Sequence, residues 1–290
     1  MPAEARTGPI GVGGRASVQR SGGGGEGGGP EPAQVRAMFD RIAGVYDVMN
    51  TLMTAGLHRR WRARAAELAR VGPGSRVLDV ATGTGELALE LAPRVTPGGE
   101  VVASDFSQAM LARARRKALA ASHGELRFEW GDALALPYGD GVFDAATVGF
   151  GARNFSDLGR GLAEMARVVR PGGRVVVLEI TSPVRPPLAQ FYALWFDRIV
   201  PLLGRLTGTA VSAWRWLRRT GGSAAIADAY AYLPDSVRRF PGPALLAEEM
   251  QRAGLSQIGY VLMAGGIVAI HVGTVHGDRA RSGADTARGD

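Results

Sequence analysis

Residues 77–86 place an apolar strand, a carboxylate and a turn containing two glycines next to one another. Asp79 lies just before the turn, Gly83 and Gly85 form it, and a helical pattern begins at Glu86. Because glycine adopts positive φ and carries no side chain, a ligand can lie directly on such a turn. The N-terminus of the following helix attracts a negatively charged ligand group. The segment predicts a nucleotide-like cofactor, with a tight strand-to-helix turn that binds nothing as the alternative.

Two further acids follow the next two strand patterns. Asp105 lies 20 residues after Gly85, where a ribose-binding acid belongs, and Asp132 is followed by Ala133 after the third strand pattern. Three carboxylates around one turn suit a ligand with ribose hydroxyls, a hydrogen-bonding base and a cationic portion. They would repel a pyrophosphate. The pattern favours S-adenosylmethionine over a nicotinamide dinucleotide, so an oxidoreductase is the weaker alternative.

The composition predicts one compact domain over residues 33–275 of the 290. Residues 1–32 hold eleven glycines and almost no apolar periodicity, so this arm and the tail 276–290 are expected to be disordered. The chain has no cysteine, which excludes disulfides and thiolate chemistry. No apolar run reaches the roughly 18–20 residues of a spanning helix, and no signal peptide is visible. We therefore expect a cytoplasmic enzyme, with peripheral contact at the inner face of the membrane left open.

The chain has a net charge of +7, and Lys117 is its only lysine among 34 basic residues. The arginines form two groups, one at residues 59, 60, 62 and 64 and the other at residues 215, 218, 219, 238 and 239. An ordinary solvated face or an anionic membrane surface would explain them. Because no aromatic stacking motif or recognition helix accompanies them, nucleic acid is not expected as a partner.

Strand and helix patterns alternate along the chain. Strands are predicted over 75–80, 100–104, 126–130, 143–149, 174–180, 258–263 and 267–272, and helices over 33–44, 57–70, 86–93, 107–120 and 157–169. Ser107 is predicted to cap the fourth helix, and Pro171-Gly172-Gly173 to end the fifth. The alternation predicts an α/β fold with a doubly wound, mostly parallel seven-stranded sheet and a C-terminal antiparallel hairpin. The carboxyl ends of the parallel strands would bring the three acids, residues 150–154 and Glu179 to one rim.

This order resembles the class I S-adenosylmethionine-dependent methyltransferases. Within that class, Tyr46-Asp47-Val48-Met49-Asn50 with Thr54, His58 and Trp61 resembles the first signature of the menaquinone/ubiquinone biosynthesis C-methyltransferases. The run 167–173 leading to Glu179-Ile180-Thr181 resembles the second, and the resemblance covers about residues 33–274. Residues 207–229 depart from it, because the substrate-covering insertion of about 185–240 is longer here. Gly149 also departs, since some members carry a cofactor-contacting Ser there.

The resemblance implies C-methylation of a polyprenyl demethylmenaquinol to menaquinol, with a ubiquinone precursor (2-polyprenyl-6-methoxy-1,4-benzoquinol) as the alternative substrate. It implies no metal, and it assigns the cofactor to Thr84, Asp105, Asp132 and Ala133, beside Gly83 and Gly85 of the turn. A non-enzymatic binding module with the same fold is the remaining alternative.

Methylating the ring carbon requires an electron-rich ring, so a group that holds a developing phenolate is needed. Arg153 and Asn154 on the rim are the candidates for this role. Tyr46, Asp47, Asn50 and His271 are further candidates for substrate contact, and the catalytic base stays unassigned. The apolar segment 188–203 is expected either to pack in the core or to cover a polyprenyl tail. A homodimer is left open.

Overall fold

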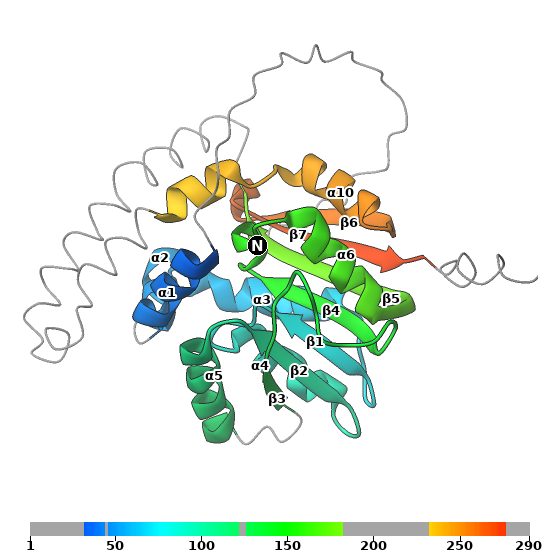
Figure 1. The fold of residues 1–290 in the computed structure, drawn as a ribbon, viewed down its shortest axis with the longest axis horizontal. Helices are drawn as coiled ribbons and strands as arrows, with labels where there is room; N and C mark the ends of the chain where they lie inside the picture. Colours follow the sequence, from blue (N-terminus) through cyan, green and yellow to red (C-terminus); the bar gives the residue numbers. More distant parts are fainter. Residues whose placement is uncertain (1–31, 44–45, 122–125, 182–231, 277–290) are drawn as a thin grey trace, which may run out of the picture.

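The computed structural model describes residues 32–43, 46–121, 126–181 and 232–276 (Figure 1). Residues 1–31 of the predicted arm, 277–290 of the predicted tail, the apolar segment 188–203 and the insertion at 207–229 lie outside these residues. Pro32, which was expected in the arm, begins a helix. Within the described residues no helix is both long enough and apolar enough to cross a membrane.

One seven-stranded sheet organises the molecule, in the order β3-β2-β1-β4-β5-β7-β6. The strands are β1 (Arg76–Val80), β2 (Glu100–Asp105), β3 (Leu126–Trp130), β4 (Phe143–Gly149), β5 (Val169–Ile180), β6 (Leu255–Met263) and β7 (Val268–Val275). The first five strands pair in parallel, whereas β7 runs antiparallel to both β5 and β6. The predicted fold class is confirmed, including the C-terminal hairpin.

Besides a helical stretch at residues 232–239, the described part of the chain contains seven labelled α-helices. They are α1 (Pro32–Ile42), α2 (Tyr46–Thr54), α3 (Leu57–Leu68), α4 (Glu86–Val95), α5 (Gln108–Ala121), α6 (Leu158–Val168) and α10 (Pro243–Arg252). Short 3-10 turns η1 (Ala152–Asn154) and η4 (Ala264–Gly266) follow β4 and β6. The sequence predicted five of the helices but missed α2 and α10. The predicted cap of α5 is confirmed, because Ser107 Oγ accepts from Met110 N at 3.1 Å.

The helix predicted over 157–169 is confirmed as α6, but Pro171-Gly172-Gly173 does not separate it from the following strand as expected. The helix already ends at Val168, and β5 begins at Val169 opposite Phe143. The register then shifts so that Ala145 faces Arg174, and residues 170–173 form the irregularity between these pairs. A proline lacks the ladder donor and is tolerated at such a bulge.

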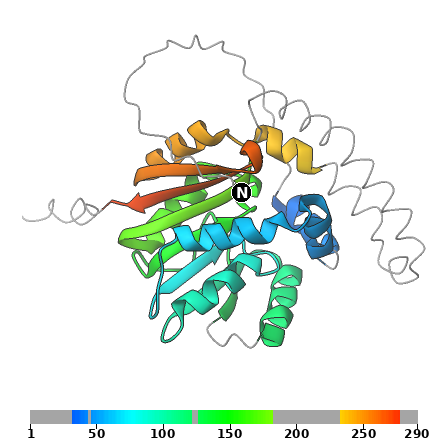
Figure 2. The ribbon, with the colours of Figure 1, turned by 180° about the vertical axis from the view of Figure 1, so that it is seen from behind.

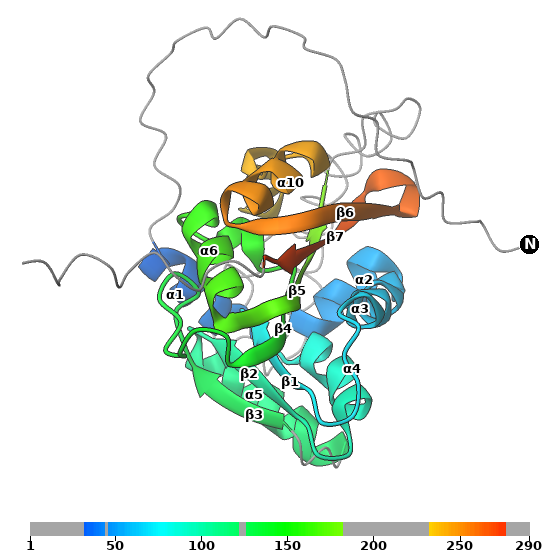
Figure 3. The ribbon, with the colours of Figure 1, turned by 90° about the vertical axis from the view of Figure 1, so that its right-hand side faces the viewer.

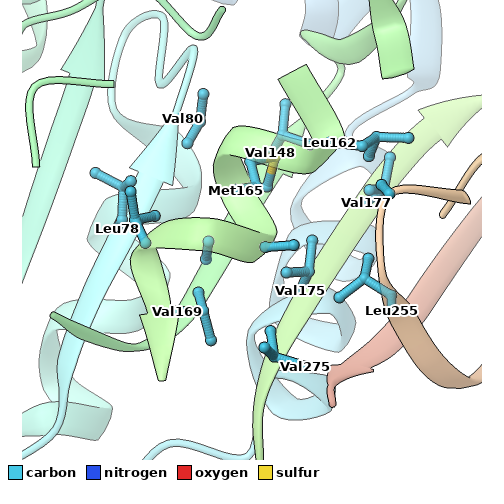
Figure 4. Packing of buried hydrophobic residues seen from close by; sticks show 14 of the residues in the cluster. Leu78, Val80, Val148, Leu162, Met165, Val169, Val175, Val177, Leu255 and Val275 are labelled. Carbon is cyan, nitrogen blue, oxygen red and sulfur yellow. The ribbon is translucent and has the colours of Figure 1, made fainter. Parts of the chain in front are cut away.

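The sheet is covered on both faces, with α6 on one side and α3 and α4 on the other (Figure 3). Strand residues such as Leu78, Val148 and Val175 pack with Leu162 and Met165 of α6, and Figure 4 shows this cluster. The second cluster joins the opposite face to α3 and α4 (the helices that carry the residues around Trp61 and Leu91). Apolar residues at helical spacing thus fix both helix layers, and with them the loops at the strand ends.

The first two helices lie beside the carboxyl ends of the strands. Met38 and Ile42 of α1 form a small core with Met110 of α5. Figure 2 shows α3 crossing the sheet from this group. The helices α1, α2 and α3 therefore bound the region where a ligand of a parallel sheet is expected.

Candidate active site

A cavity of about 330 Å³ lies at the carboxyl ends of β1 to β4, with α1 and α3 contributing to its wall. Two of its lining residues, Ala81 after β1 and Phe150 after β4, have positive φ values of 50° and 61°. Residues with a side chain adopt this region at a cost in energy, and such residues cluster at functional sites. The cavity volume is within the range of small-ligand sites.

The glycine turn after β1 lines the cavity. Gly83 has φ 58° and a Cβ there would meet nothing within 4 Å, so its backbone faces open space. Gly85 has φ 81°, and its Cβ would lie 3.1 Å from the Ala114 Cβ. The first glycine leaves room for a ligand and the second permits α4 to pack closely on α5.

Asp105 is held directly beneath this turn. Its Oδ2 accepts from Gly83 N at 2.8 Å and its Oδ1 accepts from Ser107 N at 2.8 Å. The side chain lines the cavity, and burial raises the pKa of Asp105 to about 6 despite these two hydrogen bonds. The carboxylate oxygens keep lone pairs for a ligand's hydroxyl groups.

Asp79 lies deeper, at the end of β1. It is fully buried and accepts from Thr82 Oγ1 at 2.6 Å and from Thr147 Oγ1 at 2.7 Å. Burial raises its pKa to about 6. The two raised values indicate an enclosed site in which a ligand's positive charge would favour the ionised carboxylates.

At the β3 end the cavity is lined by Asp132 and Ala133, together with the aromatic rings of Phe106 and Trp130. Asp132 Oδ1 accepts from Leu134 N at 2.9 Å, which fixes the carboxylate in a local turn. Flat apolar rings beside a hydrogen-bonding carboxylate suit a heteroaromatic base.

Thr84 lines the same cavity, but its hydroxyl is used within the protein. It donates to Asp47 Oδ1 of α2 at 2.6 Å and accepts from Lys117 Nζ at 3.0 Å. Lys117 also lies 2.8 Å from Asp47 Oδ2 and 2.6 Å from Glu86 Oε1. Burial opposes the ionisation of Asp47, yet Lys117 and Thr84 hold its pKa below the ordinary value. A ligand contact from Thr84 would therefore come from its backbone.

Arg153 is buried behind the rim and is paired with Glu179. Its Nη1 donates to Glu179 Oε1 at 2.7 Å and to the Phe150 carbonyl at 2.5 Å. Burial opposes the charge, but Glu179 raises the pKa of Arg153, so the guanidinium stays protonated. Its Nε is buried without a hydrogen-bond partner in the described part of the chain, as is Thr181 Oγ1 at the end of β5. Neither Arg153 nor Thr181 is among the residues that line the cavity, although Arg153 lies between the lining residues Gly151 and Asn154 in the sequence, and His271 Nδ1 is a third buried atom without a partner in the described residues.

The other predicted substrate residues divide into two groups. Asn154 and Tyr46 line the cavity, and Asn154 Oδ1 accepts from Tyr232 Oη at 3.0 Å. Asn50 and His271 are not among the lining residues. Asn50 lies within α2, where its carbonyl accepts from Thr54 Oγ1 at 2.7 Å. His271 is buried in β7, its Nε2 lies 2.9 Å from the Pro243 carbonyl, and its ring packs on Tyr260.

The sequence interpretation missed Arg62, Phe39, Phe106 and Trp130, which all line the cavity. The group of arginines at residues 59, 60, 62 and 64 predicts a solvated face, but Arg62 is 4% exposed. The available signal was helical periodicity, because His58, Trp61, Arg62, Ala65 and Ala66 share the buried face of α3. Phe106 and Trp130 carry no sequence signal beyond their place at the strand ends.

These residues fit S-adenosylmethionine chemically: a glycine whose backbone faces open space, two enclosed acids with raised pKa values, and an acid beside aromatic rings. A family model described as the ubiE/COQ5 methyltransferase family matches residues 29–223 and 221–275. The chain belongs to this family.

Two relatives and one solved structure illustrate the likeness. The chain is 46% identical to a demethylmenaquinone methyltransferase of Thermus thermophilus over 81% of its length and 99% of the relative. It is 38% identical to a ubiquinone/menaquinone biosynthesis C-methyltransferase of Teredinibacter turnerae over 83% of its length and 91% of the relative. A SAM-dependent methyltransferase of Thermotoga maritima has the same fold, with a TM-score of 0.54, 17% identity, and 82% and 98% of the two chains covered.

Proposed function

We propose that this protein transfers the methyl group of S-adenosylmethionine to a ring carbon of a polyprenyl demethylmenaquinol. The observation that carries the proposal is one continuous cavity that joins the acids at the ends of β1 to β3 with Tyr46 and Asn154. A cofactor at the acids and a quinol beside Tyr46 and Asn154 would share one enclosed space. Alignment of two bound reactants is the main requirement of this reaction.

The residues at the β1 to β3 ends would hold the cofactor. Asp105 would accept from the ribose hydroxyls, and Asp132 with the Ala133 N–H would accept from and donate to the adenine. Gly83 would let the ligand lie on the backbone, whereas Gly85 is not among the lining residues, and Phe106 and Trp130 would flank the base. When bound, S-adenosylmethionine supplies the electrophilic methyl group, so these residues only bind and orient.

Arg153 and Asn154 would stabilise the negative charge that grows on the quinol oxygen as its proton leaves. Arg153 cannot act as a base, since Glu179 raises its pKa. Its role is electrostatic, with Glu179 fixing the guanidinium at 2.7 Å. The Asn154 amide is oriented by Tyr232, so its nitrogen is left to donate. Tyr46 is the further candidate for substrate contact.

The comparison with two relatives favours the menaquinone branch over the ubiquinone precursor. The Thermus relative at 46% identity is named for demethylmenaquinone alone, whereas the relative named for both quinones is 38% identical. The polyprenyl tail of either substrate partitions into lipid, so we further propose that the enzyme meets its substrate at the cytoplasmic surface of the membrane.

The test uses the full chain with deuterated-methyl S-adenosylmethionine and chemically reduced quinols that carry short prenyl tails. We expect the label on the ring of the demethylmenaquinol, and slower transfer to 2-polyprenyl-6-methoxy-1,4-benzoquinol. Faster transfer to the benzoquinol would move the protein to the ubiquinone branch. Labelling of neither quinol, with methyl transfer to water-soluble phenols, would reject the quinone substrate and leave the methyltransferase assignment in place. Tighter binding of NAD than of S-adenosylmethionine would reject both.

A further inference from the structure

Arg62 of α3 is a buried cation in the wall of the cavity. It is 4% exposed and lines the cavity together with Asp79, Glu86 and Phe150. The other arginine in the lining is Arg36 of α1, which is exposed. A buried positive charge is costly unless an anion or good hydrogen bonds accompany it. The partners of Arg62 therefore decide whether its charge serves the fold or a ligand.

One guanidinium nitrogen is fixed by a chain of hydrogen bonds from α2. Arg62 Nη1 contacts His58 Nδ1, and His58 Nε2 lies 3.2 Å from Thr51 Oγ1. Because a guanidinium only donates, Nδ1 must accept, and the ring proton therefore lies on Nε2 and points to Thr51. The Thr51 hydroxyl in turn donates a hydrogen bond to the Asp47 carbonyl at 2.8 Å. Burial and the charge of Arg62 lower the pKa of His58, which agrees with a neutral ring.

The carboxylates of Glu86 and Asp47, which lie near Arg62, form ion pairs with other cations. Glu86 lies 2.6 Å from Lys117 Nζ but 3.9 Å from Arg62 Nη1, and Asp47 is paired with Lys117 and Arg113. The charge of Arg62 lowers the pKa of Asp79, but burial of Asp79 has the larger effect and raises this pKa to about 6. Within the described residues, Nη1 is the only guanidinium nitrogen of Arg62 with a hydrogen-bond partner. The guanidinium thus keeps donors for an anion in the cavity.

The place of Arg62 along the strand ends identifies that anion. Its Cζ lies 5.3 Å from the centre of the Phe150 ring, just past β4, and it neighbours the start of α4 after β1. The base-binding residues Asp132 and Trp130 lie at β3, and the ribose acid Asp105 ends β2. In the order β3-β2-β1-β4, the part of the cofactor that extends beyond the ribose would reach Arg62.

We propose that Arg62 is a specificity-determining residue that binds the α-carboxylate of the methionine part of S-adenosylmethionine. This rests on the cofactor half of the proposed function and is independent of the quinol. His58 acts as a positioning residue, because it fixes the guanidinium and links it to α2. The first turn of α4 adds its N-terminal partial charge to the same anion.

The test compares two ligands that differ only in this carboxylate, S-adenosylmethionine and its decarboxylated form, by calorimetry without quinol. The wild-type protein should bind S-adenosylmethionine about 10- to 100-fold more tightly than the decarboxylated form, as a charged hydrogen bond implies. Arg62→Gln should lose that preference by weakening only the binding of the carboxylate-bearing ligand. Arg62→Lys should restore part of it. Arg59→Gln, on the exposed side of the same helix, should behave as wild type.

Equal affinity of the wild-type protein for the two ligands would overturn the proposal, and this comparison needs no variant to fold. A folded Arg62→Gln protein that retains the full preference would overturn it as well. If the wild-type protein binds neither ligand, the cofactor assignment itself fails. If it shows the preference but methylates no quinol, only the substrate half of the proposed function is rejected.

Discussion

The hydroxyl of Thr84 in the glycine turn donates to Asp47 Oδ1 of α2 at 2.6 Å. This bond joins a loop that follows the first strand to a helix that lies 37 residues earlier in the chain. Lys117 of α5 contacts both residues and Glu86 as well, so three helices and the turn meet at one ammonium group. The cavity is therefore assembled by contacts between elements that are not neighbours in sequence.

Replacing Lys117 with Met should loosen α2 and weaken cofactor binding. The ammonium is partly exposed, so we expect a stability loss of about 1 kcal/mol or less. The larger effect should be faster amide hydrogen exchange over residues 46–54, together with weaker S-adenosylmethionine binding by calorimetry. Arg64→Met removes an exposed pair with Glu67 on α3 and serves as the control. Unchanged exchange in α2 would mean that the cluster does not hold this helix.

Replacing Asp105 with Asn should weaken S-adenosylmethionine binding by about 1–3 kcal/mol, the usual range for a charged hydrogen-bonding group. One amide oxygen cannot replace two carboxylate oxygens that also accept from Gly83 and Ser107. Asp132→Asn, at an exposed turn, should cost less. The measurement is calorimetric affinity at pH 8. An equal or smaller loss in the Asp105 variant would contradict the ribose assignment.

Arg153→Met should lower turnover by on the order of 100-fold or more, because one electrostatic stabiliser is lost. It should also destabilise the fold by about 3–5 kcal/mol, since Glu179 is left buried without its partner. The two effects can be separated with the double variant Arg153→Met/Glu179→Gln, in which no buried charge remains unpaired. We expect it to regain stability in denaturant unfolding and to stay inactive. Recovery of turnover in the double variant would show that Arg153 acts only on structure.

His271 should make folding stability depend on pH. Burial lowers its pKa from 6.5 to about 4. Between pH 6.5 and pH 4 the imidazole is protonated in the unfolded chain but neutral in the folded protein. The contribution of His271 to the free energy of unfolding is therefore complete above pH 6.5 and is lost as the pH falls towards 4. It amounts to about 3 kcal/mol. The difference in unfolding free energy between the wild-type protein and His271→Gln should therefore shrink from pH 7.5 to pH 4. A constant difference would mean that His271 does not titrate as its burial implies.

Membrane contact should be reversible and sensitive to salt. Arg239 is exposed, and Arg238 is exposed and pairs with Asp235 at 2.9 Å. Each basic residue near an anionic surface contributes about 1 kcal/mol, and the attraction decays over roughly a Debye length. We expect flotation with anionic vesicles at low salt, release at high salt, and little flotation with neutral vesicles. The Arg238→Ser/Arg239→Ser variant should float less, and equal flotation would remove these arginines from the contact.

The sheet was predictable because its strands are short apolar runs between glycine and proline turns. The sequence analysis did not predict α10 and α2, for different reasons. The α10 helix begins at Pro243 directly after Gly242, and a proline at the first helical position is typical of a helix start. The α2 helix is 9 residues long, and its sequence predicts a family signature rather than a helix. Short helices depend on tertiary contacts, here those of Asp47 and Thr51.

The acids of the site were predictable because the carboxyl ends of parallel strands meet at one edge of the sheet. The partners of each side chain were not. Nothing in the sequence indicates that the Thr84 hydroxyl is used by Asp47, or that Arg153 is paired with Glu179. His271 lies on a core strand as expected, but the antiparallel pairing of β7 brings it to Tyr260 and away from the cavity lining.

The single lysine gives the protein a built-in chemical reporter. Amine-directed reagents meet only one side chain in this sequence, Lys117. Its ammonium lies 2.8 Å from Asp47 Oδ2 and 2.6 Å from Glu86 Oε1, so these two carboxylates restrict the access of a reagent to it. Each departure of α2 from the glycine turn would expose this amine, so the rate of a single mass increase on one peptide would measure how often α2 leaves the wall of the cavity.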